Sequence, residues 1–150
     1  AVIREVRVVK TIPAPIEDVF DWMTNSDNYR RVPGVFVADL VEPGSPTPQG
    51  PGAVRKVVSA GMKLTEQILE VDRPALMRYR VLSSFPPMRH EYGSMTFGSS
   101  PEGTTVTWVS RFEAVSPILP GLASRLLAVG VAAGFRGVLR TADKELRRGR

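Results

Sequence analysis

The sequence predicts an α+β domain in which about seven strands form an antiparallel sheet, two short helices follow the first strand and a long helix comes last. Three observations predict this class. A strand pattern runs directly into an amphipathic helix between residues 6 and 23, alternating segments joined by short turns follow, and the final segment is long and apolar. A sheet and helices in this order can enclose an internal space.

The first strand breaks at Pro13, and the first helix begins at Pro15. Val6 and Val8 alternate with charged Arg7, which is the period-2 pattern of a half-buried strand. Pro15 suits the first helical position because its missing N–H leaves no helical hydrogen bond unmade. Two acidic residues follow in the first turn, where the helix dipole favours negative charge. The apolar stripe at helical spacing comprises Ile16, Val19, Phe20 and Met23.

The middle of the chain predicts a second short helix and the remaining strands. Residues 25–32 form a short helix or turn, and four prolines and three glycines make residues 42–52 a long surface loop. The predicted strands span residues 35–41, 53–60, 62–72, 75–84, 89–98 and 104–115. Short turns between successive strands favour an antiparallel meander.

The last segment predicts a helix that begins after Pro117 and Pro120. Residues 126–135 are apolar all round, but this run is far shorter than the roughly 20 residues that span a bilayer. Gly130, Gly134 and Gly137 each weaken a helix by about 1 kcal/mol relative to alanine. They are tolerable where they permit a bend or the close approach of a sheet or ligand. A dimer interface would explain the same composition, so monomer and homodimer both stay open.

Length and composition indicate one soluble globular domain over residues 1–150, with 43% hydrophobic and 23% charged residues. The absence of cysteine excludes disulfides, thiol catalysis and thiolate metal sites, and a single histidine argues against a zinc site. We therefore expect no metal and no cofactor. The N-terminus carries no visible secretory signal, so a cytoplasmic protein is expected. The excess of arginine over lysine indicates a bacterial source.

The net charge of +5 is concentrated at the C-terminal end. Seven basic and two acidic residues lie from Pro117 onward, so this segment carries the whole excess. Basic residues late in a helix complement its dipole and keep its end solvated. Stacking aromatics do not interleave with these arginines, so nucleic acid is not an expected partner. Contact with an anionic membrane stays open.

Four segments carry a resemblance to a known family: residues 11–22 (TIPAPIEDVFDW), 28–29 (NY), 32–35 (VPGV) and 103–112 (GTTVTWVSRF). They resemble the START-like (SRPBCC) superfamily, and within it the polyketide cyclase/dehydratase and lipid-transport group. The resemblance covers almost the whole chain. It implies a helix-grip fold, in which a curved antiparallel sheet wraps around the long C-terminal helix with a hydrophobic cavity between them. Members bind lipids, polyketides, quinones or other apolar molecules, and only some are enzymes, so the resemblance indicates the fold better than the activity.

Alternation predicts which sheet residues face the interior, because side chains two positions apart share a face. The inward face begins with Val54 and Val58 and includes Val81 and Val106. The predicted cavity residues are Met62, Leu64, Glu66, Ile68, Met77, Tyr79, Met95, Phe97, Trp108, Phe112 and, from the last helix, Phe135. Methionine adapts to irregular shapes, which suits an apolar ligand site as well as an ordinary packed core.

Glu66, Tyr79 and Arg89 are the candidates for chemistry. Glu66 lies on the inward face among apolar residues, where a carboxylate must be paired, protonated or displaced by a bulge. By the same count Arg89 and Glu91 share the inward face of Met95 and would supply a partner. Together these groups would orient a polar head group or perform acid–base chemistry. The alternative places Arg89 and Glu91 at the solvated rim.

Alternation places His90 on the outer face of its strand, together with Tyr92, Ser94 and Thr96. A lone exposed histidine is therefore predicted there, and Arg78 and Arg80 are likewise predicted to face outward. Gly93, alone within a strand, predicts a bulge or a close backbone approach.

Three functions are compatible with these features. The first is a binding or transport protein for a hydrophobic small molecule such as a lipid, polyketide or quinone. The second is a polyketide cyclase, aromatase or dehydratase that uses acid–base residues in the cavity. The third is an interaction module that meets a protein or membrane through its last helix, which predicts a filled interior and an exposed apolar patch. The shape of the cavity, and with it the ligand, is not readable from the sequence.

Overall fold

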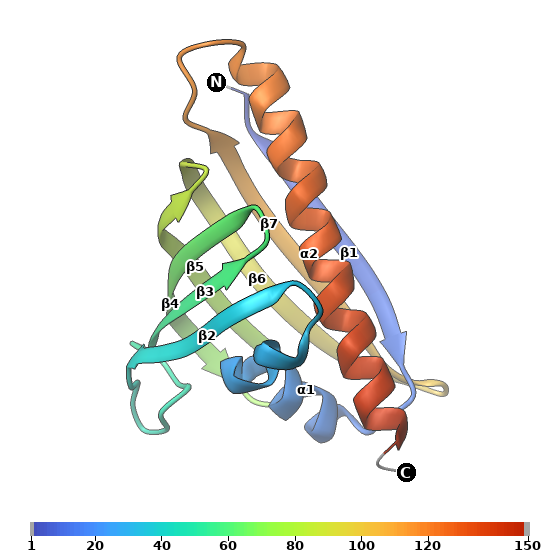
Figure 1. Cartoon of the computed structure of the whole chain (residues 1–150). Coiled ribbons are helices and arrows are strands. Elements are labelled where there is room, and N and C mark those ends of the chain that lie inside the picture. The colour runs from blue at the N-terminus through green and yellow to red at the C-terminus, as the bar shows by residue number, and fades with distance from the viewer. Residues whose placement is uncertain (1, 149–150) are drawn as a thin grey trace.

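The structure, a computed structural model, describes residues 2–148 and confirms the predicted fold class (Figure 1). In chain order the elements are β1 (Arg4–Ile12), α1 (Ile16–Thr24), the 3₁₀ helix η1 (Ser26–Arg31), β2 (Val35–Glu42), β3 (Val54–Ser59), β4 (Met62–Asp72), β5 (Leu76–Phe85), β6 (Met88–Ser100), β7 (Gly103–Ala114) and α2 (Pro120–Arg148). The two short helices lie directly after β1, as the proline and helical-stripe pattern predicted.

The seven strands form one antiparallel sheet in the order β1-β7-β6-β5-β4-β3-β2. Strands β2 to β7 follow one another as a meander because tight turns join several of them, such as the turn at Gly61 with φ +86°. The segment α1–η1 carries the chain from β1 at one edge to β2 at the other. The first two strands therefore lie at opposite edges of the sheet.

Helix α2 lies along one side of the curved sheet (Figure 1). It packs against β1, β7 and α1, while α1 packs against β6 and β7. The 3₁₀ helix η1 packs against β2, whereas the main packing of α2 is on β1 and β7 at the other edge of the sheet. This arrangement leaves space between α2 and the part of the sheet opposite it.

Side chains fill the space between α1 and the sheet and form a packed core there. Phe20 of α1 meets Phe97 of β6 edge to face, with ring centroids 5.1 Å apart. Met77 and Met95 are paired across β5 and β6 and are fully buried in the same core. The short helix thus closes one end of the curved sheet, and any ligand space must lie beyond it.

Candidate functional site

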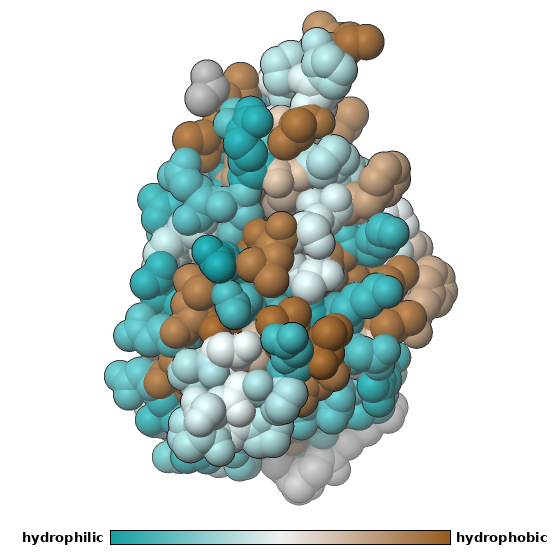
Figure 2. All heavy atoms as spheres, turned by 90° about the vertical axis from the view of Figure 1, so that its left-hand side faces the viewer, coloured by the Kyte–Doolittle hydropathy of each residue, from teal (hydrophilic) through white to brown (hydrophobic). Residues whose placement is uncertain are grey.

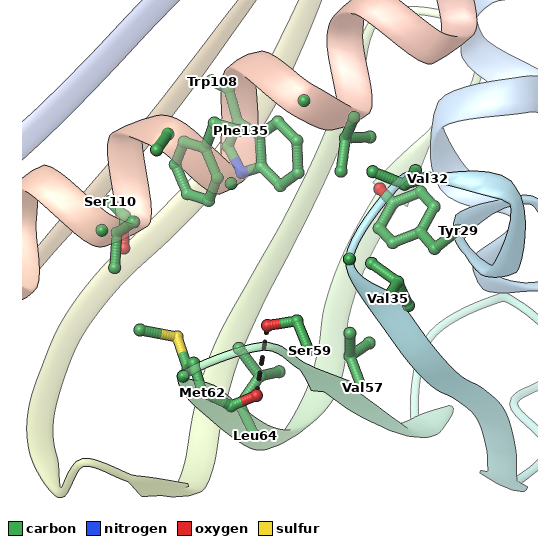
Figure 3. A pocket seen from close by; sticks show the side chains of 18 of the residues that line it. Tyr29, Val32, Val35, Val57, Ser59, Met62, Leu64, Trp108, Ser110 and Phe135 are labelled. Atoms are coloured by element: carbon green, nitrogen blue, oxygen red, sulfur yellow. Dashed lines mark hydrogen bonds between the residues drawn. The ribbon is translucent and has the colours of Figure 1, made fainter.

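A cavity of about 700 Å³ lies between α2 and the inner face of the sheet (Figure 3). Its walls come from η1 and β2, from β3 to β7, and from α2 between Gly130 and Lys144. Trp108 and Phe135 lie on one side of the cavity, and Met62 and Leu64 lie across from them in Figure 3. This volume falls within the usual range of small-molecule sites, about 300–1,000 Å³.

The cavity opens to solvent between α2 and two turns of the sheet. The cavity-lining residues that are exposed mark this mouth: Pro33, Gly34, Ala60, Gly61, Gly130, Ala133, Gly134, Arg140 and Lys144. They come from the η1–β2 connection, the β3–β4 turn and one face of α2. The mouth is therefore bordered by small residues and, near the C-terminal end of α2, by two cations.

The glycines of α2 give the cavity its room. A Cβ at Gly130 or Gly134 would have no heavy atom within 4 Å, and one at Gly137 would approach Val32 to 3.7 Å. All three glycines line the cavity. Helix α2 therefore has no side chains at these positions, on the face where a ligand would lie. The glycines lower the stability of the helix itself.

The structure places seven of the eleven predicted cavity residues on the cavity wall: Met62, Leu64, Glu66, Tyr79, Trp108, Phe112 and Phe135. The other four, Ile68, Met77, Met95 and Phe97, do not line it. They are buried in the packed core instead, because the inward face of the sheet continues past the cavity into the end that α1 closes. Alternation finds the inward face but cannot tell which part of it a helix covers.

The prediction for β3 was wrong by one residue. Arg55 and Val57 face inward rather than Val54 and Val58, since Arg55 is 1% exposed and Val57 lines the cavity. This strand carries valine and a basic residue on both faces, so its alternation is ambiguous. Alternation therefore did not identify Arg55, the largest fully buried side chain among residues 2–148.

Arg55 and Glu66 form a buried ion pair beside the cavity. Arg55 Nε donates to Glu66 Oε1 at 3.0 Å, Nη2 donates to the same oxygen, and Nη1 donates to the carbonyl oxygen of Thr24 at 2.7 Å. Burial opposes the charged form of Arg55, but the adjacent Glu66 carboxylate together with the nearby tyrosines outweighs this, and the pKa of Arg55 is raised. Glu66 is thus a paired carboxylate on the cavity wall.

Arg89, predicted to join Glu66 and Tyr79, lies outside the cavity. Its side chain is 67% exposed and its Nε donates to Glu113 Oε1 at 2.9 Å. The register of β6 shifts between His90 and Tyr92, so Glu91 is bulged and the alternation reverses there. Counting back from Met95 across this bulge gave Arg89 and Glu91 the wrong face.

The same bulge turns His90 inward, contrary to its predicted outer position. Its ring stacks on Tyr79 with centroids 5.7 Å apart and lines the cavity. The backbone N–H of Val81 donates to His90 Nδ1 at 3.2 Å, and Nε2 lies 3.1 Å from the hydroxyl of Ser110. Burial lowers the pKa of His90 to about 4, so the ring is neutral at pH 7.

His90 is the only histidine, so its burial predicts a distinct pH dependence of stability. An unfolded histidine binds a proton below about pH 6.5, whereas folded His90 resists it until about pH 4. The unfolded state therefore holds more protons in this window, and the free energy of unfolding should fall as the pH is lowered from 6.5 to 4. Urea denaturation across this range measures the slope. His90→Asn, whose Oδ1 can replace Nδ1, should flatten it; an unchanged slope would contradict the prediction.

Tyr79 is held in one position by three neighbours. Trp108 Nε1 donates to its hydroxyl oxygen at 2.8 Å, His90 stacks on its ring, and Gly93 lies opposite it on β6. A Cβ at Gly93 would lie 2.6 Å from the Tyr79 ring, so Gly93 marks a close approach, as predicted. Burial, and then the nearby Glu66 carboxylate, raise the pKa of Tyr79, which keeps its hydroxyl protonated.

Gly93→Ala is expected to lower the free energy of unfolding by about 1–3 kcal/mol, the usual cost of overpacking. The Tyr79 ring cannot yield freely because Trp108 and His90 hold it. Urea denaturation tests this expectation, with Gly98→Ala as the control, since a Cβ at Gly98 meets nothing within 4 Å. Equal stability of Gly93→Ala and the wild-type protein would show that the ring is not confined.

The His90–Ser110 pair does not have the arrangement of a nucleophile and its base. A base must accept the serine proton, but Nδ1 already accepts from Val81 and therefore carries no proton. In the neutral ring the proton is then on Nε2, which donates to Ser110. Among residues 2–148, no group of three or more His, Asp and Glu side chains is placed to hold a metal ion.

An exposed apolar ridge lies near the mouth, on the first half of α2 and the connection before it. It consists of Ile118, Leu119, Leu122, Leu126 and Val129, each more than half exposed. Figure 2 shows apolar atoms at the upper end of the molecule, where this connection lies. Helix α2 has the length and hydropathy of a membrane-spanning helix, but core helices of soluble proteins share these properties, and α2 packs on β1 and β7.

Residues 4–148 match the model of a protein family described as polyketide cyclase/dehydrase and lipid transport. Among curated proteins, nothing matches the sequence at a significant level.

Solved structures match nearly the whole chain. The Zhui aromatase/cyclase from Streptomyces sp. R1128 gives a TM-score of 0.81 at 18% identity, over 97% of this chain and 94% of that chain. TTHA0849 from Thermus thermophilus gives 0.79 at 19% identity, over 97% and 99%. The di-domain ARO/CYC BexL from the BE-7585A biosynthetic pathway gives 0.79 at 18% identity, over 97% of this chain and 50% of that one. At these identities the likeness is one of fold.

Proposed function

The chain belongs to the polyketide cyclase/dehydrase and lipid transport family, as the sequence resemblance predicted, and on this premise we propose that it binds or transports a hydrophobic small molecule. The observation that carries the proposal is the cavity of about 700 Å³ between α2 and the sheet. Its wall is mostly aliphatic and aromatic, with a few polar groups. Apolar walls with a few placed polar groups are typical of sites that bind drug-sized molecules. A lipid, polyketide or quinone-like ligand has the matching chemistry.

The cavity also separates this proposal from an interaction module, which predicts a filled interior. The exposed ridge on α2 could contact a protein or membrane surface. Such a contact would not need a cavity, so an interaction module does not explain why the cavity is there. The small residues along the α2 face favour a ligand, because they widen the cavity and contribute little to an apolar contact surface.

A second candidate function is polyketide cyclisation or dehydration, and one observation favours it. Glu66 and Tyr79 both line the cavity, so a carboxylate and a phenol would meet the same ligand. Such a pair can accept a proton and polarise a carbonyl, which general acid–base chemistry on a polyketide requires. Arg89, the third candidate, takes no part because it lies outside the cavity. The aromatase/cyclases among the structural neighbours lend this candidate support by fold alone.

Native mass spectrometry of the protein purified from bacterial cells, followed by organic extraction, tests the proposed function. We expect a stoichiometric mass increment that disappears on extraction and yields an apolar compound. Conversion of that compound on incubation with the protein would favour the cyclase, and its unchanged release would favour the carrier. A protein that stays empty after exposure to lipids, quinones and aromatic polyketides would contradict both.

A further inference from the structure

The polar groups on the cavity wall form one directed chain of hydrogen bonds. It begins at the backbone N–H of Val81, which donates to His90 Nδ1 at 3.2 Å. Because this nitrogen accepts, the ring proton of the neutral histidine lies on Nε2 and is donated to Ser110 Oγ at 3.1 Å. The direction of the chain is thus fixed by the backbone.

The chain of hydrogen bonds ends at the hydroxyl group of Tyr79. Its oxygen accepts from Trp108 Nε1 at 2.8 Å and also interacts with the Ser110 hydroxyl. Since Ser110 Oγ accepts from His90, the serine contributes its own proton to that interaction or to the cavity. If the serine donates to Tyr79, the tyrosine's proton points elsewhere; if the tyrosine donates to Ser110, the serine's proton does. At least one O–H of Tyr79 and Ser110 is therefore left without an acceptor from this chain.

Both hydroxyl-bearing side chains line the cavity, although Tyr79 is 4% and Ser110 3% exposed. A buried O–H that lacks an acceptor has lost the hydrogen bond that water would give it, which is unfavourable. A ligand that brings an acceptor to this wall recovers that loss. The stacking of His90 and the close approach of Gly93 hold Tyr79 in place, so little further ordering is needed on binding.

The charges near this wall decide what kind of acceptor binds. Glu66 is a carboxylate on the same wall, and its charge acts on Tyr79. Arg55 donates Nε and Nη2 to Glu66, so the pair is close to neutral overall. Among the described residues, no free cation is therefore left on this part of the wall to bind a carboxylate or phosphate. The cations Arg140 and Lys144 lie at the exposed mouth instead. The acceptor that suits this wall is neutral.

We propose that Tyr79 and Ser110 form a hydrogen-bond donor site for a carbonyl oxygen of the ligand. The inference rests on the proposed function and narrows its ligand class to apolar, ketone-bearing molecules rather than fatty acids or hydrocarbons. Trp108 and Phe135 stack beside this site, with centroids 3.8 Å and planes 8° apart, and offer a flat aromatic surface to a planar ligand.

Two probes of nearly the same shape test the donor site. 2-Acetylnaphthalene carries a carbonyl oxygen where 2-isopropenylnaphthalene carries a methylene group, and titration calorimetry gives the affinity of each. Tyr79→Phe is expected to weaken binding of the ketone by about 3- to 10-fold, the range of one neutral hydrogen bond, and to leave the alkene unaffected. Tyr92→Phe is the matched control, because Tyr92 lies on the outer face against Arg78 and Arg111.

Three results would overturn the donor site. One of them contradicts the donor site but leaves the proposed binding function standing. If both probes bind and Tyr79→Phe affects them equally, the donor site is wrong and the binding function stands. Failure of both probes to bind the wild-type protein contradicts both. If Tyr79→Phe does not fold, the infrared carbonyl stretch of the ketone bound to wild type decides. A shift to lower wavenumber than in hydrocarbon solvent supports the donor site, and an unshifted band overturns it.

Discussion

Gly134→Phe is expected to weaken binding of an apolar probe by about 30-fold or more while the protein stays folded. A Cβ at Gly134 enters open space, so the backbone accepts the side chain without a clash. Because Gly134 lines the cavity at its mouth, the phenyl ring would occupy ligand space. Overpacking a site costs about 2 kcal/mol, which corresponds to roughly 30-fold in affinity.

The stability of this variant should be equal to or slightly above that of wild type, because phenylalanine is a better helix former than glycine by a few tenths of a kcal/mol. Calorimetric titration with 2-acetylnaphthalene and urea denaturation measure the two effects. Val129→Phe, on the exposed ridge of the same helix, is the control and should bind normally. Normal binding by Gly134→Phe together with loss in Val129→Phe would place the site on the ridge.

Glu66→Gln is expected to lower the free energy of unfolding by about 3 kcal/mol. The substitution keeps the shape of the side chain but removes the charge opposite Arg55, which is 1% exposed. An uncompensated buried charge costs about 3–5 kcal/mol, far more than the loss of an exposed pair. Urea denaturation at pH 7 gives the value.

Two variants control for this result. Asp21→Asn breaks the exposed pair of Asp21 with Arg73, in which both side chains are about half exposed, and should cost about 1 kcal/mol or less. The double variant Arg55→Met/Glu66→Met removes both buried charges and should recover more than half of the loss. If Glu66→Gln is no less stable than Asp21→Asn, the carboxylate does not compensate Arg55.

The order and type of the elements could be predicted from the sequence because local signals determine them. Proline and the first-turn acids place the start of α1, and the period-2 segments and tight turns specify a meander. The same alternation assigned the inward faces of β4, β5 and β7, where most of the large apolar residues share one face.

The site could be predicted only in part, because its remaining features depend on contacts between distant segments. A single bulged residue between His90 and Tyr92 reversed the faces of His90 and Arg89, and the local sequence does not specify at which residue the bulge falls. The burial of Arg55 depends on Glu66 of the neighbouring strand β4 and on the carbonyl oxygen of Thr24 at the end of α1. Gly93, next to the bulge, was the one signal that pointed to irregular pairing there.

The boundary between cavity and core was the other feature that alternation could not supply. Met77 and Met95 share the inward face with Tyr79, but the core beneath α1 encloses them. Whether an inward residue meets a ligand or a helix depends on where the chain between β1 and β2 folds back. The glycines of α2 indicated the position of the cavity more directly, because they leave the helix without side chains where the cavity opens.

The measurement that tests the central claim most directly is a ¹⁵N-NMR titration of the wild-type protein with 2-acetylnaphthalene. A ligand in the cavity predicts saturable one-to-one shifts at Gly134, Gly61 and Ser110, which line it from α2, the β3–β4 turn and β7. The amides of Leu122 and Val129 on the ridge should change little. Shifts confined to the ridge, or no shifts at saturating probe, would contradict a binding cavity between the sheet and α2.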